Sequence, residues 1–139
     1  MGCYDYSKPN YYFVTICTNR RKCIFGDPGD LNCYGEIARQ SICEIERHFP
    51  NVKIDKFAVM PNHIHMIVAL QANDTALPVV IGQYKAFVTK QIRAIEPGVK
   101  VWQTSFHDHV IRNQTGYSKI WNYIDGNPGK WQEDCFYSG

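Results

Sequence analysis

Residues 52–70 read VKIDKFAVMPNHIHMIVAL, and this stretch decides the fold class. It contains two runs rich in apolar and β-branched side chains, Val52–Met60 and His63–Leu70, which have the length and composition of β-strands. Between the runs stands the Pro61-Asn62 pair, which is typical of a tight turn. The stretch therefore predicts a β-hairpin with two antiparallel arms.

Further elements are expected on both sides of this hairpin, from β-branched runs for strands and from apolar stripes at helical spacing for helices. They are a strand at 11–18, a helix at 35–49 that ends at Pro50, a helix from about Pro78 to Pro97-Gly98, a strand within 105–111 and a last helix at about 115–126. The stripe of the second helix is Val80, Tyr84, Phe87, Val88, Ile92 and Ile95. The order β-α-β-β-α-β predicts an α+β, ferredoxin-like split βαβ fold: a four-stranded antiparallel sheet with two helices on one face, plus a C-terminal helix that carries tyrosine.

The composition fits a single globular domain, and we expect this domain to span residues 1–139. Hydrophobic residues make up 45% of the chain and charged residues 20%, which excludes a disordered chain. No apolar run has the length of a membrane span, and the start MGCYDYSKPN lacks the features of a secretory signal. We therefore expect a soluble, cytoplasmic protein with no membrane partner, whose six cysteines are thiols. The net charge of +2 does not by itself indicate nucleic-acid binding.

The most informative residues are His63 and His65 in the second arm of the hairpin. Residues i and i+2 of a strand point to the same face, so the two imidazoles lie side by side, while the apolar residues between and after them point to the other face. Imidazole is the commonest protein ligand for metal ions, and a pair on one face suits a metal site. The alternative is a pair of half-exposed histidines with ordinary hydrogen bonds. A second doublet, His107 and His109, has the same spacing and weakens the signal.

The last helix has an apolar stripe and a polar flank. The stripe is formed by Tyr117, Ile120, Trp121 and Ile124. Tyr123 lies roughly 110° from the centre of this stripe, and Lys119 and Asn127 lie one turn before and after it on the same flank. The helix therefore presents a polar edge beside an apolar base. By itself, this pattern is better explained by an amphipathic interfacial tyrosine, since the chain has nine tyrosines.

Together, a histidine doublet on a strand and a late helix with a tyrosine resemble a known family. These are the HUH single-tyrosine transposases, particularly the REP-associated tyrosine transposases of the insertion-sequence-200-like group. The resemblance covers nearly the whole chain. It is carried by residues 12–15 with 19–21 (YFVT and NRR), 59–65 (VMPNHIH), 102–103 with 108–113 (WQ and DHVIRN), and 123–128 (YIDGNP).

The resemblance implies a transposase that cleaves and joins single-stranded or hairpin DNA through a 5′-phosphotyrosine intermediate. It implies that Tyr123, rather than Tyr117, is the nucleophile, because Tyr123 matches the tyrosine that precedes the family's Asn-Pro pair. It also implies a divalent metal, Mg²⁺ or Mn²⁺, held by His63 and His65. Asn127 stands at the position of the third ligand, where some relatives have glutamine.

Five basic residues are candidate contacts for DNA phosphates, namely Arg20, Arg21, Lys22, Arg112 and Lys119. Tyr11 or Trp102 can stack on bases, although either fits a core position equally well. Two other functions stay open: a non-catalytic module that binds single-stranded nucleic acid, and a metal nuclease that uses water while Tyr123 is structural. The sequence also leaves open whether the chain acts as a homodimer.

Overall fold

A four-stranded antiparallel sheet in the order β4-β5-β1-β6 forms the centre of the computed structural model, which describes residues 10–71 and 76–127. The strands are β1 (Asn10–Cys17), β4 (Val52–Met60), β5 (His63–Leu70) and β6 (His107–Ile111). The helices are α1 (Cys33–His48), α2 (Leu77–Ile95) and α3 (Gln114–Gly126). A short 3₁₀ helix, η1 (Asn19–Arg21), and a small hairpin of β2 (Gly26–Asp27) and β3 (Asp30–Leu31) connect β1 to α1.

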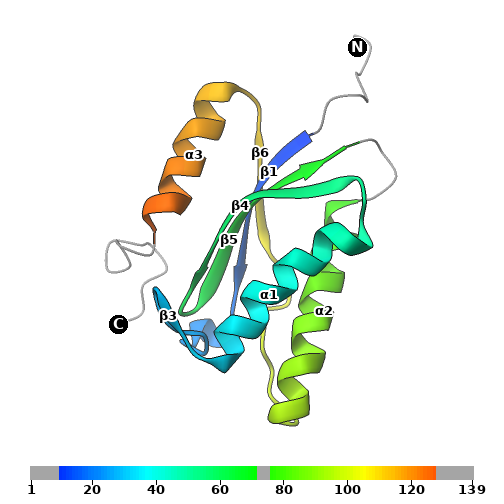
Figure 1. Cartoon of the computed structure of the whole chain (residues 1–139), viewed down its shortest axis with the longest axis vertical. Coiled ribbons are helices and arrows are strands. Elements are labelled where there is room, and N and C mark those ends of the chain that lie inside the picture. Colours follow the sequence, from blue (N-terminus) through cyan, green and yellow to red (C-terminus); the bar gives the residue numbers. More distant parts are fainter. Residues whose placement is uncertain (1–9, 72–75, 128–139) are drawn as a thin grey trace.

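Helices lie on both faces of the sheet (Figure 1), and each face has its own apolar cluster. α1 and α2 cover one face, where Ile64, Met66 and Val68 of β5 are fully buried. α3 lies across the other face, where Ile124 packs into a smaller cluster. The members of that cluster are Ala58, Met60, Ile67, Ile111 and Ile124. Because side chains alternate along β5, the strand that supplies the large core on one face presents His63 and His65 on the α3 face.

The central position of β1 aligns residues from distant parts of the chain. Thr15 of β1 pairs with His65 of β5 on one side and with His107 of β6 on the other. Cys17 pairs with His63. Directly paired residues of antiparallel strands point to the same face, so β1 supplies the side chains that lie next to the histidine pair.

Local signals explain where the helices begin. The side chain of Asn32 accepts a hydrogen bond from the backbone N–H of Gly35 at 2.9 Å and caps α1. Asn113 caps α3 in the same way, through the N–H of Gly116 at 2.8 Å. Pro78 occupies the first turn of α2, where its missing N–H costs nothing.

The predicted fold class, the order of the main strands and helices along the chain and the hairpin bounds are confirmed, and α3 lies over the sheet face that carries the histidine pair. The prediction of the apolar stripe of α2 is wrong at two positions, because Phe87 and Ile95 are exposed. The η1 turn and the β2–β3 hairpin lie in a segment that the sequence indicated only as a loop. Among the described residues, no helix is long and apolar enough to cross a membrane. The assignment of the whole chain to one domain stays a prediction.

Four cysteines fall in the described residues, and all four are thiols rather than disulfides, namely Cys17, Cys23, Cys33 and Cys43. Cys3 and Cys135 lie outside the described residues.

Candidate active site

The imidazoles of His63 and His65 converge on the α3 face of the sheet. Their Nε2 atoms are 3.1 Å apart, and the two ring centroids are 4.5 Å apart. Both residues are buried, with 0% and 1% of their surface exposed. The pair is therefore not on an open face, since α3 and the neighbouring strands enclose it. Burying two imidazoles is unfavourable unless their ring nitrogens have partners.

Each imidazole is held at Nδ1 by a side chain that the sequence analysis did not single out. The Nδ1–H of His63 donates to Oδ1 of Asn62 at 2.7 Å, because that carbonyl oxygen can only accept. Nδ1 of His65 is hydrogen-bonded to Oγ1 of Thr15 at 2.9 Å. Such bonds fix the ring planes and direct both Nε2 atoms to one point.

Tyr123 stands beside this pair on its own chain. Its ring centroid is 5.4 Å from that of His65 and 6.1 Å from that of Phe13, which also contacts His65 at 5.2 Å. The side chain keeps 41% of its surface exposed, so a substrate can reach it. The buried Ile124 anchors the adjacent position of α3, and an ion pair of 2.8 Å between Lys56 and Asp125 fastens the same turn to β4.

Asn127 follows Tyr123 by four residues, at the C-terminal end of α3. Only 3% of its surface is exposed. Its Oδ1 is the one buried side-chain oxygen or nitrogen in the described part of the chain that has no hydrogen-bond partner. An unpaired buried carbonyl oxygen is costly and marks a position for an absent partner. Lys119, one turn before Tyr123, is exposed.

Tyr117 has a different environment, although it lies on the same helix. Its hydroxyl donates to Asp55 on β4 at 2.8 Å, and its ring packs edge-on against Tyr11 at 5.4 Å. Burial, and then the bond to the Asp55 carboxylate, raise the pKa of Tyr117 to about 12. A phenol that holds its proton this tightly is a poor nucleophile, and its hydroxyl is already bonded to Asp55.

The basic residues do not form one surface. Three exposed basic residues follow β1 in the chain, namely Arg20, Arg21 and Lys22. The last residue of β1 pairs with His63. This basic turn, residues 19–22, therefore lies at the histidine end of the sheet. On α2, Lys85 is used structurally, since its ammonium donates to the carbonyl of Gln103 at 2.7 Å and burial lowers its pKa.

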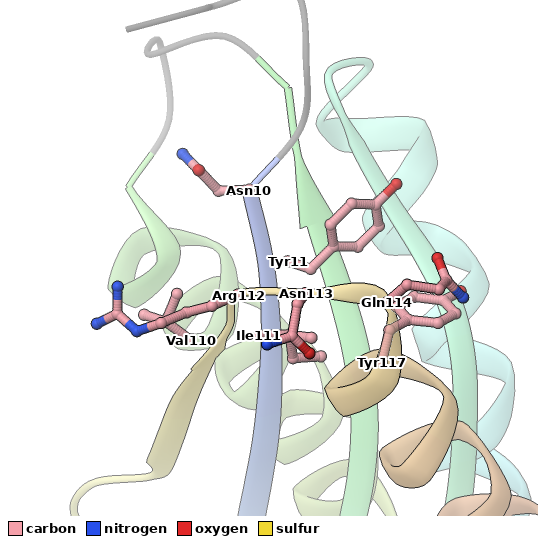
Figure 2. A pocket seen from close by; sticks show the side chains of 8 residues that line it. All are labelled: Asn10, Tyr11, Val110, Ile111, Arg112, Asn113, Gln114 and Tyr117. Atoms are coloured by element: carbon pink, nitrogen blue, oxygen red, sulfur yellow. The ribbon is translucent and has the colours of Figure 1, made fainter. Parts of the chain in front are cut away.

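Arg112 lies at the opposite end of the sheet. It lines a groove of about 960 Å³ at the junction of β6 and α3, and Figure 2 shows its side chain extending away from Tyr11 and Tyr117. Tyr11 pairs with Ala69, four residues along β5 from His65 and six from His63, so the Tyr11 side of this groove is about 13 to 20 Å from the histidine pair. The structure thus does not bring Arg112 together with the basic turn.

The structure also places Trp102 and the second histidine doublet, which were candidates from the sequence. Trp102 is 5% exposed and its indole N–H donates to the carbonyl of Lys85 at 3.1 Å, so it belongs to the core. His107 and His109 are exposed on the edge strand β6. Among the described residues, no group of three or more His, Cys, Asp and Glu side chains is placed to hold a metal ion.

Comparisons with known proteins agree with this geometry. Residues 5–127 match the family model described as "Transposase IS200 like". The chain belongs to this transposase family. A REP-associated tyrosine transposase of Escherichia coli is 29% identical over 90% of this chain and 70% of its own length. An uncharacterized protein of Haemophilus influenzae is 33% identical over 96% of this chain and 88% of its own length.

A solved structure extends the family likeness to the fold. The structure of a REP-associated tyrosine transposase bound to a REP hairpin superposes with a TM-score of 0.67 at 27% identity, covering 94% of this chain and 74% of that one. The family that the motifs resemble is therefore confirmed.

Proposed function

We propose that this transposase nicks and joins single-stranded or hairpin DNA through a covalent 5′-phosphotyrosine at Tyr123, with the help of a divalent metal. The observation that carries the proposal is the ring of Tyr123, 5.4 Å from His65, beside two Nε2 atoms that converge to 3.1 Å. The solved relative that is bound to a REP hairpin supports hairpin DNA as the substrate.

The donor set fits a divalent metal. Two nitrogen ligands about 2.1 Å from an ion, at right angles to each other, stand about 3 Å apart, close to the observed spacing of the Nε2 atoms. Because His63 donates from Nδ1, its Nε2 carries the lone pair that a metal needs. The unpaired Oδ1 of Asn127 supplies an oxygen donor for the third position. Mg²⁺ prefers oxygen ligands, so the imidazole pair makes Mn²⁺ the better experimental probe.

The chemistry follows from these positions. When bound, a divalent ion polarises the scissile phosphate and offsets its negative charge. The phenolic oxygen of Tyr123 loses its proton and bonds to phosphorus, while the bond from phosphorus to the 3′ oxygen breaks and that oxygen becomes a hydroxyl. The phosphotyrosine conserves the energy of the broken bond. A second 3′-hydroxyl can therefore displace Tyr123 and restore a phosphodiester without ATP.

The basic turn is the proposed contact for phosphates next to the scissile position, since Arg20, Arg21 and Lys22 are exposed at the histidine end of the sheet. Arg112 and Lys119 are proposed to contact more distant parts of the DNA. Because Tyr123 lies against the histidines of its own chain, a monomer suffices for this mechanism.

The deciding experiment uses a pool of random-sequence single strands and hairpins labelled at the 3′ end. The 5′-phosphotyrosine retains the 3′ part of the strand, so the label moves with the protein on a denaturing gel. We expect an adduct with the wild type and with Tyr117→Phe, and none with Tyr123→Phe. Tyr117→Phe is the matched control, because it removes the same single oxygen from the same helix.

Other outcomes would identify other functions. Free labelled fragments that persist in Tyr123→Phe would mean that water is the nucleophile. DNA binding with neither fragments nor adduct would mean a binding module. If the adduct were lost in Tyr117→Phe and kept in Tyr123→Phe, the assignment of Tyr123 as the nucleophile would be wrong.

The metal is tested separately, by electron paramagnetic resonance of Mn²⁺. The double variant His63→Ala/His65→Ala should lose Mn²⁺ binding and the adduct, while circular dichroism shows that it is folded. Normal Mn²⁺ binding by this variant would place the metal elsewhere, with His107 and His109 as the next candidates.

A further inference from the structure

The side chain of Asn62 forms hydrogen bonds both to the histidine pair and to the basic turn. It occupies the tight turn between β4 and β5, directly before His63, and it is fully buried. Its Oδ1 accepts the Nδ1–H of His63 at 2.7 Å, and its Nδ2 donates to the backbone carbonyl of Arg21 at 3.3 Å. One planar amide therefore connects an imidazole of the histidine pair to the basic turn.

The basic turn has an unusual backbone. Arg20 and Arg21 have φ angles of 56° and 54°, in the left-handed region, which is unfavourable for residues other than glycine. Such a conformation persists only when its surroundings enforce it. The sequence contains no glycine here to explain it, so hydrogen bonds within the turn and from the rest of the fold enforce it.

Several of those hydrogen bonds involve the turn that holds Asn62. The hydroxyl of Thr18 donates to the carbonyl of Lys22 at 2.7 Å and approaches that of Asn62 at 3.1 Å. The N–H of Thr18 donates to the same Asn62 carbonyl at 3.0 Å. The side chain of Asn62 adds the bond to Arg21. The two turns are thus bonded through backbone and side chain together.

We propose that Asn62 is a positioning residue that couples phosphate binding at the basic turn to the orientation of His63. The inference rests on the proposed function, since it assumes that His63 holds a metal and that the basic turn holds DNA. A rotation of the Arg21 carbonyl weakens the bond that it accepts from Nδ2. The amide can then turn Oδ1 away from His63, and the ring loses the bond that places its lone pair on Nε2.

Substitutions at Asn62 separate its two bonds. Asn62→Ala removes both, so we expect Mn²⁺ affinity to fall about tenfold and DNA affinity to fall about fivefold, the effect of one lost hydrogen bond. Asn62→Asp keeps an acceptor for His63, so Mn²⁺ affinity should stay within about twofold of the wild type. Thr18→Val loosens the basic turn and with it the Arg21 carbonyl that holds the amide, so it should weaken both DNA binding and Mn²⁺ binding.

Each affinity is measured without the other ligand. Mn²⁺ is titrated alone, and the random-sequence single strands are bound in EDTA, so that no metal bridges protein and DNA. Nitrogen-15 NMR of the imidazoles adds a readout that a merely structural role would not move. His63 should be the Nδ1–H tautomer in the wild type and in Asn62→Asp, and should shift toward Nε2–H in Asn62→Ala.

Asn51→Ala is the matched control. The side chain of Asn51 also donates to a backbone carbonyl, that of Gln71 at 3.0 Å, at the other end of the same hairpin. Both affinities and the tautomer of His63 should be unchanged in this variant. Equal losses in Asn51→Ala and Asn62→Ala would overturn the proposal.

The inference and the proposed function fail in different ways. If the wild type binds Mn²⁺ and DNA but Asn62→Ala binds both as well, or keeps the Nδ1–H tautomer of His63, the inference alone is refuted. If the wild type binds no Mn²⁺, or binds it without the two histidines, the proposed function fails and the inference falls with it. Should Asn62→Ala not fold, Asn62→Asp and Thr18→Val carry the test. Unchanged Mn²⁺ binding in Thr18→Val, or weakened Mn²⁺ binding in Asn62→Asp, would then refute the inference.

Discussion

Replacing Ile124 by alanine should separate Tyr123, the proposed nucleophile, from the histidine pair while the rest of the fold persists. Ile124 is the only residue of α3 that is fully buried, and its neighbours form the smaller apolar cluster on the α3 face. Removing its branched side chain should cost about 2–4 kcal/mol, as for other isoleucine-to-alanine changes in cores. That free energy corresponds to a shift of about 30- to 1,000-fold in the ratio of docked to undocked helix.

Hydrogen exchange measures this shift directly, because helix amides exchange faster when a helix undocks locally. We expect the protection of α3 to fall by about that factor, with little change in β1 and β5, and the yield of covalent adduct to fall with it. The control is Ile81→Ala, which removes the same atoms from a fully buried position of α2 in the other cluster. It should lower global stability without selective loss of α3 protection. Equal loss of protection in α3 and β5 of Ile124→Ala would show that α3 unfolds only with the whole protein and would refute the reasoning.

Three further predictions concern single contacts. Thr15→Val removes the hydroxyl bonded to His65 at 2.9 Å, so the affinity for Mn²⁺ should fall about tenfold in a titration, with unfolding in urea almost unchanged. The pKa of Tyr117 is raised from 10.0 to about 12 in the folded protein, so the wild type should lose stability as the pH rises between these values. In urea unfolding at several pH values, Tyr117→Phe should lose less stability over the same range. Lys56→Met removes an exposed ion pair with Asp125, and the loss should be below about 1 kcal/mol and should vanish in high salt.

The sequence predicted those features that depend on local periodicity. The bounds of the hairpin arms were correct to the residue, because a proline and an asparagine interrupt two β-branched runs. The shared face of His63 and His65 followed from the two-residue period of a strand. The separation of Tyr117 from Tyr123 followed from the helical period. Each of these signals is contained within one element.

Features that depend on pairing between distant segments could not be predicted in this way. Thr15 meets His65 only because of the register between β1 and β5, which no local pattern specifies. Arg20 and Arg21 adopt a left-handed backbone without a glycine that would signal it in the sequence. Hydrogen bonds, among them one from the turn before His63, hold this backbone in place. Phe87 has the spacing of a core residue on α2, yet it is exposed, because α1 and the sheet cover a narrower arc of that helix than the apolar pattern spans.

The place of α3 after all four strands in the chain has a consequence for the timing of synthesis. The sheet, the histidine pair and the basic turn are all made before the ribosome reaches Tyr123, since chains are made and tend to fold from the N-terminus. A translation product that stops before α3 would lack the proposed nucleophile but keep the proposed DNA contacts of the basic turn. Such a fragment would also leave the apolar patch beneath α3 exposed to water, which favours aggregation and removal by proteases. The position of one helix in the chain thus delays the proposed strand cleavage until all four strands of the sheet have been made.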